Sequence, residues 1–219
     1  MSLGAMRGVF WIIVAAIGTV LASAPAVAHP HVWVTIRSQL LFSSDGAVVG
    51  VRHAWTFDDM FSAFATQGLP QQTKGQFTRE ELASLAEVNV TSLKEYAYFT
   101  FARADGKNAL FSDPKDYWLD YRDAMLTLNF TLPLKQPVKA REFALEVYDE
   151  TYFVAFEMAP KDPVALGTGA PPACRSTVRA PQELTVEQSR RLSELDAATP
   201  NIDDKLDDSF ANRIIVICP

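Results

Sequence analysis

The three histidines of the 219-residue chain all fall between positions 29 and 53. His29 and His31 flank Pro30, and His53 follows further along. Imidazole binds zinc, copper, nickel and cobalt, so the first pair is a candidate metal site. Residues two apart in an extended strand project to the same face, with Cα atoms about 7 Å apart, and can share one ion. Two imidazoles make a weak site, so a third ligand has to come from elsewhere in the fold.

The residues before His29 have the layout of a secretory signal peptide. Arg7 is their only charged residue, an apolar run follows from Val9 to Leu21, and small residues end at Ala28. This run is shorter than the roughly 20 residues that a membrane-spanning helix needs. We therefore expect residues 1–28 to be removed, leaving a periplasmic protein without membrane insertion.

Cleavage after Ala28 would give His29 a free α-amine, which can chelate a metal together with its own imidazole. Pro30 has no backbone N–H, so the square-planar copper or nickel site that uses successive deprotonated amides is excluded. Two arrangements stay open. Either the α-amine binds the ion together with side chains, or the two imidazoles bind it without the amine. The ion could be zinc, nickel, cobalt or copper.

The histidines lie on a predicted β-hairpin, with strands at 31–42 and 47–57. Asp45-Gly46 between them is typical of a two-residue turn. This turn places Phe42 opposite Val49 and Ile36 opposite Trp55, and the alternation of apolar residues favours the same register.

The same register selects partners for the histidines. His31 falls opposite Met60, which makes Asp58 its diagonal neighbour on the polar face. His53 falls opposite Ser38 on the apolar face. It is therefore read as a hydrogen-bonded core histidine rather than as a ligand of the same ion.

Two carboxylates are candidates to complete the metal site, and each has a structural alternative. Asp58 also suits the N-cap of a short helix predicted over 58–67. Asp149 lies at a strand turn, where aspartate is common. The predicted metal ligands are thus His29, His31, Asp58 and Asp149, with the structural roles left open.

The rest of the chain predicts an α+β fold with a single domain over 29–219, made mainly of antiparallel sheet with two or three helices. A helix is expected over 78–97, opened by a capping box of Thr78 and Glu81, and another over 186–195. The expected strands are 98–103, 109–112, 117–121, 125–132, 142–148, 152–158 and 213–218. Residues 167–219 are expected to form a C-terminal extension rather than a separate domain.

Cys174 and Cys218 are the only cysteines, and they form no CxxC motif. In an oxidising compartment they are expected to form a disulfide that ties the C-terminal extension to the body. Closing the loop between Cys174 and Cys218 should stabilise the fold by about 4 kcal/mol, because the cross-link reduces the conformational entropy of the unfolded chain. A redox or metal role for the thiols is the alternative.

Charge and motifs exclude several functions. The formal net charge is −6 and no cluster of lysine and arginine is present, which argues against nucleic acid as a partner. The chain lacks the nucleophile elbow, the phosphate-binding and dinucleotide loops and the zinc-protease motif. No catalytic activity is therefore predicted.

Four segments together resemble a bacterial periplasmic family catalogued as domain of unknown function 1007. They are His29 to Val34, Trp55 to Asp59 with Ser62, Glu146 to Asp149 with Tyr152, and Phe210-Ala211 with Val216 and Cys218. The resemblance implies a periplasmic component of a nickel, cobalt or zinc transport system, with an inner-membrane metal permease as a possible partner. The alternatives are a structural or protein-interaction module without bound metal, and a metalloenzyme with an N-terminal histidine chelate.

Overall fold

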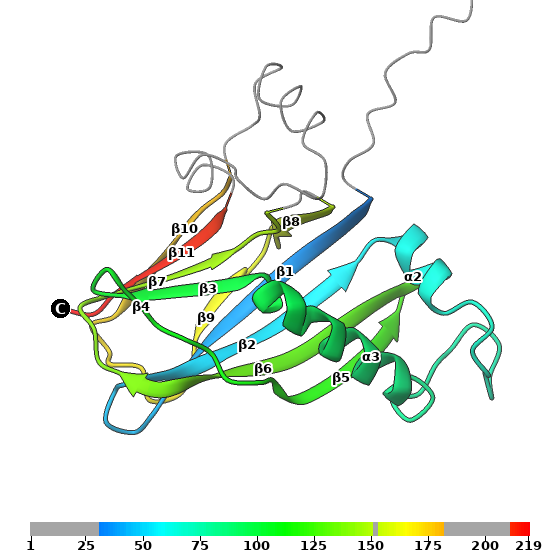
Figure 1. Ribbon diagram of the computed structural model, residues 1–219, viewed down its shortest axis with the longest axis horizontal. Coiled ribbons are helices and arrows are strands. Elements are labelled where there is room, and N and C mark those ends of the chain that lie inside the picture. Colours follow the sequence, from blue (N-terminus) through cyan, green and yellow to red (C-terminus); the bar gives the residue numbers. More distant parts are fainter. Residues whose placement is uncertain (1–30, 151–152, 182–210) are drawn as a thin grey trace, which may run out of the picture.

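The computed structural model describes residues 31–150, 153–181 and 211–219, and these consist mostly of β-strands (Figure 1). The strands form two sheets with two α-helices beside them. The predicted mainly antiparallel sheet with helices is therefore confirmed, but the helices are too short for the fold to be clearly α+β. The predicted signal peptide, His29 and the helix predicted over 186–195 lie outside the described residues.

The first sheet has the strand order β5-β6-β2-β1-β8. Its strands are β1 (Val32–Phe42), β2 (Val48–Phe57), β5 (Lys115–Arg122), β6 (Met125–Val138) and β8 (Val154–Met158). A further short strand, β9 (Val164–Leu166), pairs with β1 beyond β8. Both β8 and β9 run parallel to β1, so the expectation of antiparallel pairing is wrong at this edge. Alternation of apolar residues reports which face is buried but carries no information on strand direction.

The β1–β2 hairpin has the predicted register along most of its length but not at the turn. Ile36 pairs with Trp55 as expected, whereas Phe42 pairs with Val48 instead of Val49. Gly46 donates to the Ser43 carbonyl at 3.0 Å and has a φ of +80°, so three residues rather than two form the loop. A bulge then absorbs the extra residue and restores the register that the apolar pattern requires.

The second sheet is antiparallel throughout, in the order β10-β11-β7-β3-β4. Its strands are β3 (Thr100–Ala104), β4 (Lys107–Asn108), β7 (Glu142–Val147), β10 (Arg175–Arg179) and β11 (Asn212–Ile217). The predicted final strand is thus present, and it lies between β10 and β7 (Figure 1). The strand predicted over 109–112 is wrong, because only an isolated bridge joins Phe111 to Leu134 there. The strands β9 and β10 were not predicted.

The first helix begins where the sequence predicts, whereas the second helix begins later than the predicted Thr78 and is shorter than expected. Asp58 caps α2 (Asp59–Ala65). The capping box forms, because the Thr78 N–H donates to the Glu81 carboxylate and the Glu81 N–H donates to the Thr78 hydroxyl. It belongs to a turn before α3 (Ala83–Leu93) rather than to the helix itself. A 3-10 turn, η1 (Lys94–Phe99), follows, and its last three residues have positive φ angles, which end the helix before the predicted Ala97.

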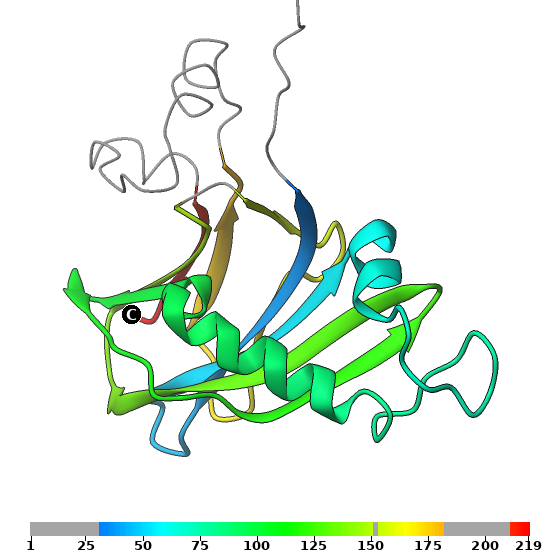
Figure 2. The ribbon, with the colours of Figure 1, turned by 45° about the vertical axis from the view of Figure 1, so that its right-hand side comes forward.

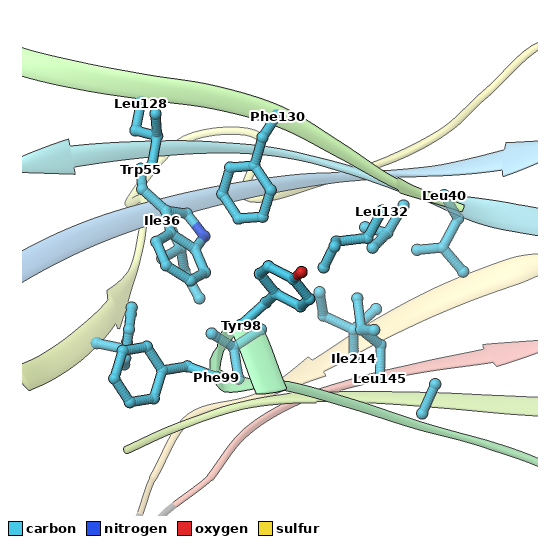
Figure 3. Packing of buried hydrophobic residues seen from close by; sticks show 14 of the residues in the cluster. Ile36, Leu40, Trp55, Tyr98, Phe99, Leu128, Phe130, Leu132, Leu145 and Ile214 are labelled. Atoms are coloured by element: carbon cyan, nitrogen blue, oxygen red, sulfur yellow. The ribbon is translucent and has the colours of Figure 1, made fainter. Parts of the chain in front are cut away.

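The core lies between the two sheets, and α3 runs along the β5 side of the first sheet (Figure 2). Trp55, Phe130 and Leu132 of the first sheet face Leu145 and Ile214 of the second (Figure 3). Each of these side chains is almost completely buried. The core therefore fixes the distance between the sheets, whose strand ends carry the candidate functional residues.

Candidate functional site

The chain enters the first sheet at His31, which is exposed. The His31 N–H donates to the Phe153 carbonyl at 3.0 Å, and the two rings lie 5.0 Å apart between centroids. The expected position opposite Met60 is wrong, because the β1–β2 pairing stops at Phe57 and Met60 belongs to helix α2. The neighbour of His31 is therefore the segment leading into β8.

Asp58 fixes the end of β2 to the start of β1. Its Oδ2 accepts the Trp33 N–H at 2.8 Å, its Oδ1 accepts the Phe61 N–H at 2.7 Å, and its own N–H donates to the Trp33 carbonyl. The predicted N-cap role of Asp58 is confirmed. Both carboxylate oxygens still have lone pairs for a further ligand, because a carboxylate offers about four acceptor positions. Metal binding by Asp58 stays a prediction.

Asp149 lies between β7 and β8 and is 5% exposed. Its Oδ2 accepts the Val154 N–H at 2.9 Å, which ties the strand connection to the first residue of β8. Val154 in turn pairs with Val32, the residue after His31. The side chain of Asp149 is thereby held at the same end of β1 as His31.

The N-terminal end of β1 brings three of the four predicted ligands into one region. Asp149 is reached through β8, and Asp58 is reached through Trp33 on β1 itself. The fourth, His29, lies outside the described residues. Within residues 31–150, 153–181 and 211–219, no three His, Cys, Asp or Glu side chains are grouped closely enough to hold a metal ion.

His53 is a fully buried core histidine, as predicted, and it connects the two sheets. Its Nδ1 lies 2.9 Å from the Ser38 hydroxyl and its Nε2 lies 3.3 Å from the Thr100 hydroxyl. The Thr100 hydroxyl already donates its proton to the Tyr98 carbonyl at 2.7 Å, so it accepts from Nε2–H. His53 is then a neutral Nε2–H tautomer whose Nδ1 accepts from Ser38. Burial lowers the pKa of His53 to about 3, because the charged ring would lose its hydration.

Cys174 and Cys218 form the predicted disulfide. Cys218 follows β11, and Cys174 precedes β10, so the bond joins two neighbouring strands of the second sheet near their ends. No free cysteine is present. Neither cysteine therefore offers a free thiol as a metal ligand in this oxidised form.

A hollow of about 220 Å³ lies beside Asp149, and sequence reasoning did not identify it. Four aromatic residues line it: Tyr96, Phe99, Phe101 and Tyr148. The acidic residues Glu95, Asp149 and Glu150 also line it. Its two sides come together because Thr100 pairs with Val147 and the Tyr148 N–H donates to the Phe99 carbonyl at 3.1 Å. Acidic residues flanking aromatic ones in both segments were the available sequence signal.

Comparison with known proteins places the chain in a family without an established activity. The family model described as protein of unknown function (DUF1007) matches residues 14–218. The chain belongs to this family. An uncharacterised protein of Haemophilus influenzae is 27% identical to this DUF1007 protein over 195 residues, which cover 88% of this chain and 92% of the relative. In the ranges that the structure describes, no helix of this DUF1007 protein is long and apolar enough to cross a membrane.

Proposed function

We propose that this DUF1007 protein is an exported transition-metal-binding accessory of a nickel, cobalt or zinc transport system. In this proposal the signal peptide is removed after Ala28 and the periplasmic protein begins at His29. The α-amine and imidazole of His29 and the imidazole of His31 bind the ion, and a carboxylate completes the site. The partner is an inner-membrane permease that receives or delivers the metal.

One observation carries the proposal. His31 is exposed at the start of β1, and the carboxylates of Asp58 and Asp149 are anchored to backbone N–H groups of the same strand end or its neighbour. Carboxylates held in place by hydrogen bonds suit metal binding, because fixed ligands lose less entropy when the ion binds.

The test uses protein recovered from the periplasm of an expressing bacterium. Mass spectrometry should give a polypeptide that begins at His29, and elemental analysis should give close to one equivalent of zinc, nickel, cobalt or copper. An intact leader, or a trimmed chain that takes up none of these ions, contradicts the proposal.

Substitutions then separate metal ligands from structural residues. His31→Ala should reduce metal affinity at least tenfold with little change in stability, because the side chain is exposed. Asp149→Asn keeps an oxygen that accepts the Val154 N–H but removes the charge, so it should also weaken binding. Asp59→Asn, on the exposed first turn of α2, is the matched control and should bind normally. Equal affinity of all four proteins would remove His31 and Asp149 from the site.

The α-amine is tested by extending the chain before His29. A cytoplasmic version with additional residues ahead of His29 should bind the same ion more weakly than the exported protein. Equal binding by the two versions would leave the imidazoles as ligands and exclude the amine.

A further inference from the structure

We propose that the hollow beside Asp149 binds an organic cation, a guanidinium or alkylammonium group on a short apolar stem. The inference does not rest on the metal site proposed above, although Asp149 belongs to both. It rests on the shape of the hollow, the chemistry of its walls and the charge at its edge.

Four aromatic rings line the hollow, in two contacting pairs. The rings of Tyr96 and Phe99 are stacked, with centroids 5.2 Å apart and planes 21° apart. The rings of Phe101 and Tyr148 lie across the β3–β7 pairing, with centroids 4.8 Å apart. Aromatic faces attract cations through the ring quadrupole, and they also bury the methylene groups of a stem.

The charge at the edge of the hollow selects a positive ligand. Glu95, Asp149 and Glu150 line it, and none of the described residues that line it is basic. Glu95 and Glu150 are exposed and come from opposite sides, one from η1 and the other from the segment after β7. A cation between them meets a carboxylate on each side, whereas an anion or a neutral apolar molecule gains nothing from this arrangement.

The size of the hollow limits the ligand to a side-chain-sized group. Its volume of about 220 Å³ is below the range of pockets that hold drug-sized molecules, which begins at about 300 Å³. One guanidinium or ammonium group with a stem of a few carbons fills it. Such a group has two sources, a free small amine or guanidine and the arginine or lysine side chain of another protein.

The wall formed by η1 is held in place by its backbone. Ala97, Tyr98 and Phe99 have φ angles of 49°, 55° and 47°. This left-handed turn inserts Tyr98 into the core, where it is 7% exposed, and leaves Tyr96 at the surface, 50% exposed. The aromatic wall is therefore in position before any ligand binds, which reduces the entropy lost on binding.

The experiment is an NMR titration of the full exported chain in the presence of a chelator, so that a metal ion at Asp149 cannot contribute. The probes are butylguanidinium and a short uncharged peptide with one central arginine. Butylurea and the same peptide with citrulline are matched neutral controls. The Ala97 methyl signal reports on the hollow, and the methyl signals of Ile217, at the far end of β11, report on non-specific effects.

A cation bound in the hollow should shift the Ala97 signal with a dissociation constant on the order of 1 mM, and the neutral controls should bind at least about fivefold more weakly. Phe101→Leu and Glu95→Gln should each weaken cation binding about two- to fivefold. Glu142→Gln, at the other end of β7, should leave it unchanged. Glu95 is exposed, so its substitution tests the hollow without disturbing the fold.

The two probes distinguish the sources of the cation. Binding of the arginine peptide at least about tenfold tighter than butylguanidinium assigns the hollow to a protein side chain, and equal binding assigns it to a small organic cation. Equal binding of the charged and neutral probes, or no shift of Ala97 up to about 20 mM of either cation, overturns the proposal. Loss of metal binding in the experiments above would not affect this result, because the chelator is present throughout.

Discussion

The buried His53 should make the free energy of unfolding depend on pH between about 3 and 6.5, which an exposed histidine would not do. The folded state keeps the ring neutral, with a pKa of about 3, whereas in the unfolded chain the pKa is about 6.5. Below pH 6.5 the unfolded state binds a proton that the folded state does not. The free energy of unfolding therefore falls as the pH falls from about 6.5 towards 3, and it is insensitive to this group above that window.

The size of the effect follows from the shift. Each pH unit between the two pKa values costs about 1.4 kcal/mol, so the loss relative to neutral pH is about 3 kcal/mol at pH 4.5. Carboxylates also titrate in this range, and a variant without the histidine is needed to isolate its contribution. His53→Leu has a similar volume and removes the titrating ring, with its hydrogen bonds, from the pocket formed with Trp55 and Phe130.

The assay is urea unfolding followed by tryptophan fluorescence at several pH values between 7.5 and 4.5. At pH 7.5 the variant should be less stable by about 2–4 kcal/mol, because Ser38 and Thr100 lose their buried partner. As the pH falls, the two proteins should converge, with the difference shrinking by about 3 kcal/mol at pH 4.5. A constant difference across the whole pH range would show that folding does not lower the pKa of His53 and would refute the argument that burial keeps the ring neutral.

Three further predictions concern the frame that holds these sites. Gly50→Ala should destabilise the fold by about 2 kcal/mol or more in urea titrations, because a Cβ there would lie 2.5 Å from the Leu132 carbonyl oxygen. An unchanged urea midpoint of unfolding would contradict the close packing of β2 on β6. Ala97→Gly should raise the melting temperature, because glycine relieves about 1 kcal/mol of strain at a left-handed backbone position, whereas glycine usually destabilises a fold. A lower melting temperature would argue against the positive φ angle of Ala97. Replacing both Cys174 and Cys218 by alanine should lower the free energy of unfolding by about 4 kcal/mol relative to the oxidised protein. A decrease below about 1 kcal/mol would mean that the disulfide is not needed to hold β11 in place.

The sequence predicts local features of this fold well, because turn chemistry, caps and apolar alternation act over short distances. The register of β1 with β2, the Asp58 cap and the buried position of His53 all follow from residues close together in the chain. The single-residue error at the hairpin turn has the same origin. Asp45-Gly46 fits both a two-residue loop and a three-residue loop with glycine last, and the bulge that reconciles them leaves no separate mark in the sequence.

Features that depend on distant parts of the chain were not predictable in this way. The parallel pairing of β8 with β1 follows from the path of the chain through the second sheet, which alternation does not report. The neighbour of His31 was predicted wrongly for this reason. An argument from the β1–β2 hairpin alone places Met60 opposite His31 and ignores β8, which lies more than 100 residues later in the chain. The hollow was missed for the same reason, since its two sides meet only through the pairing of Thr100 with Val147.

Asp149 joins these long-range features. Its carboxylate accepts the first N–H of β8, which lies beside the entry of β1, and it also lines the hollow whose other wall is η1. The parallel strand β8 is therefore what brings a residue from the end of β7 to the end of β1 at which His31 lies. If β8 ran antiparallel, its first residue would lie at the opposite end of β1, and His31 would have no anchored carboxylate from that side. The unusual direction of this one strand is thus the structural condition for the proposed metal site, while the hollow depends only on the β3–β7 pairing.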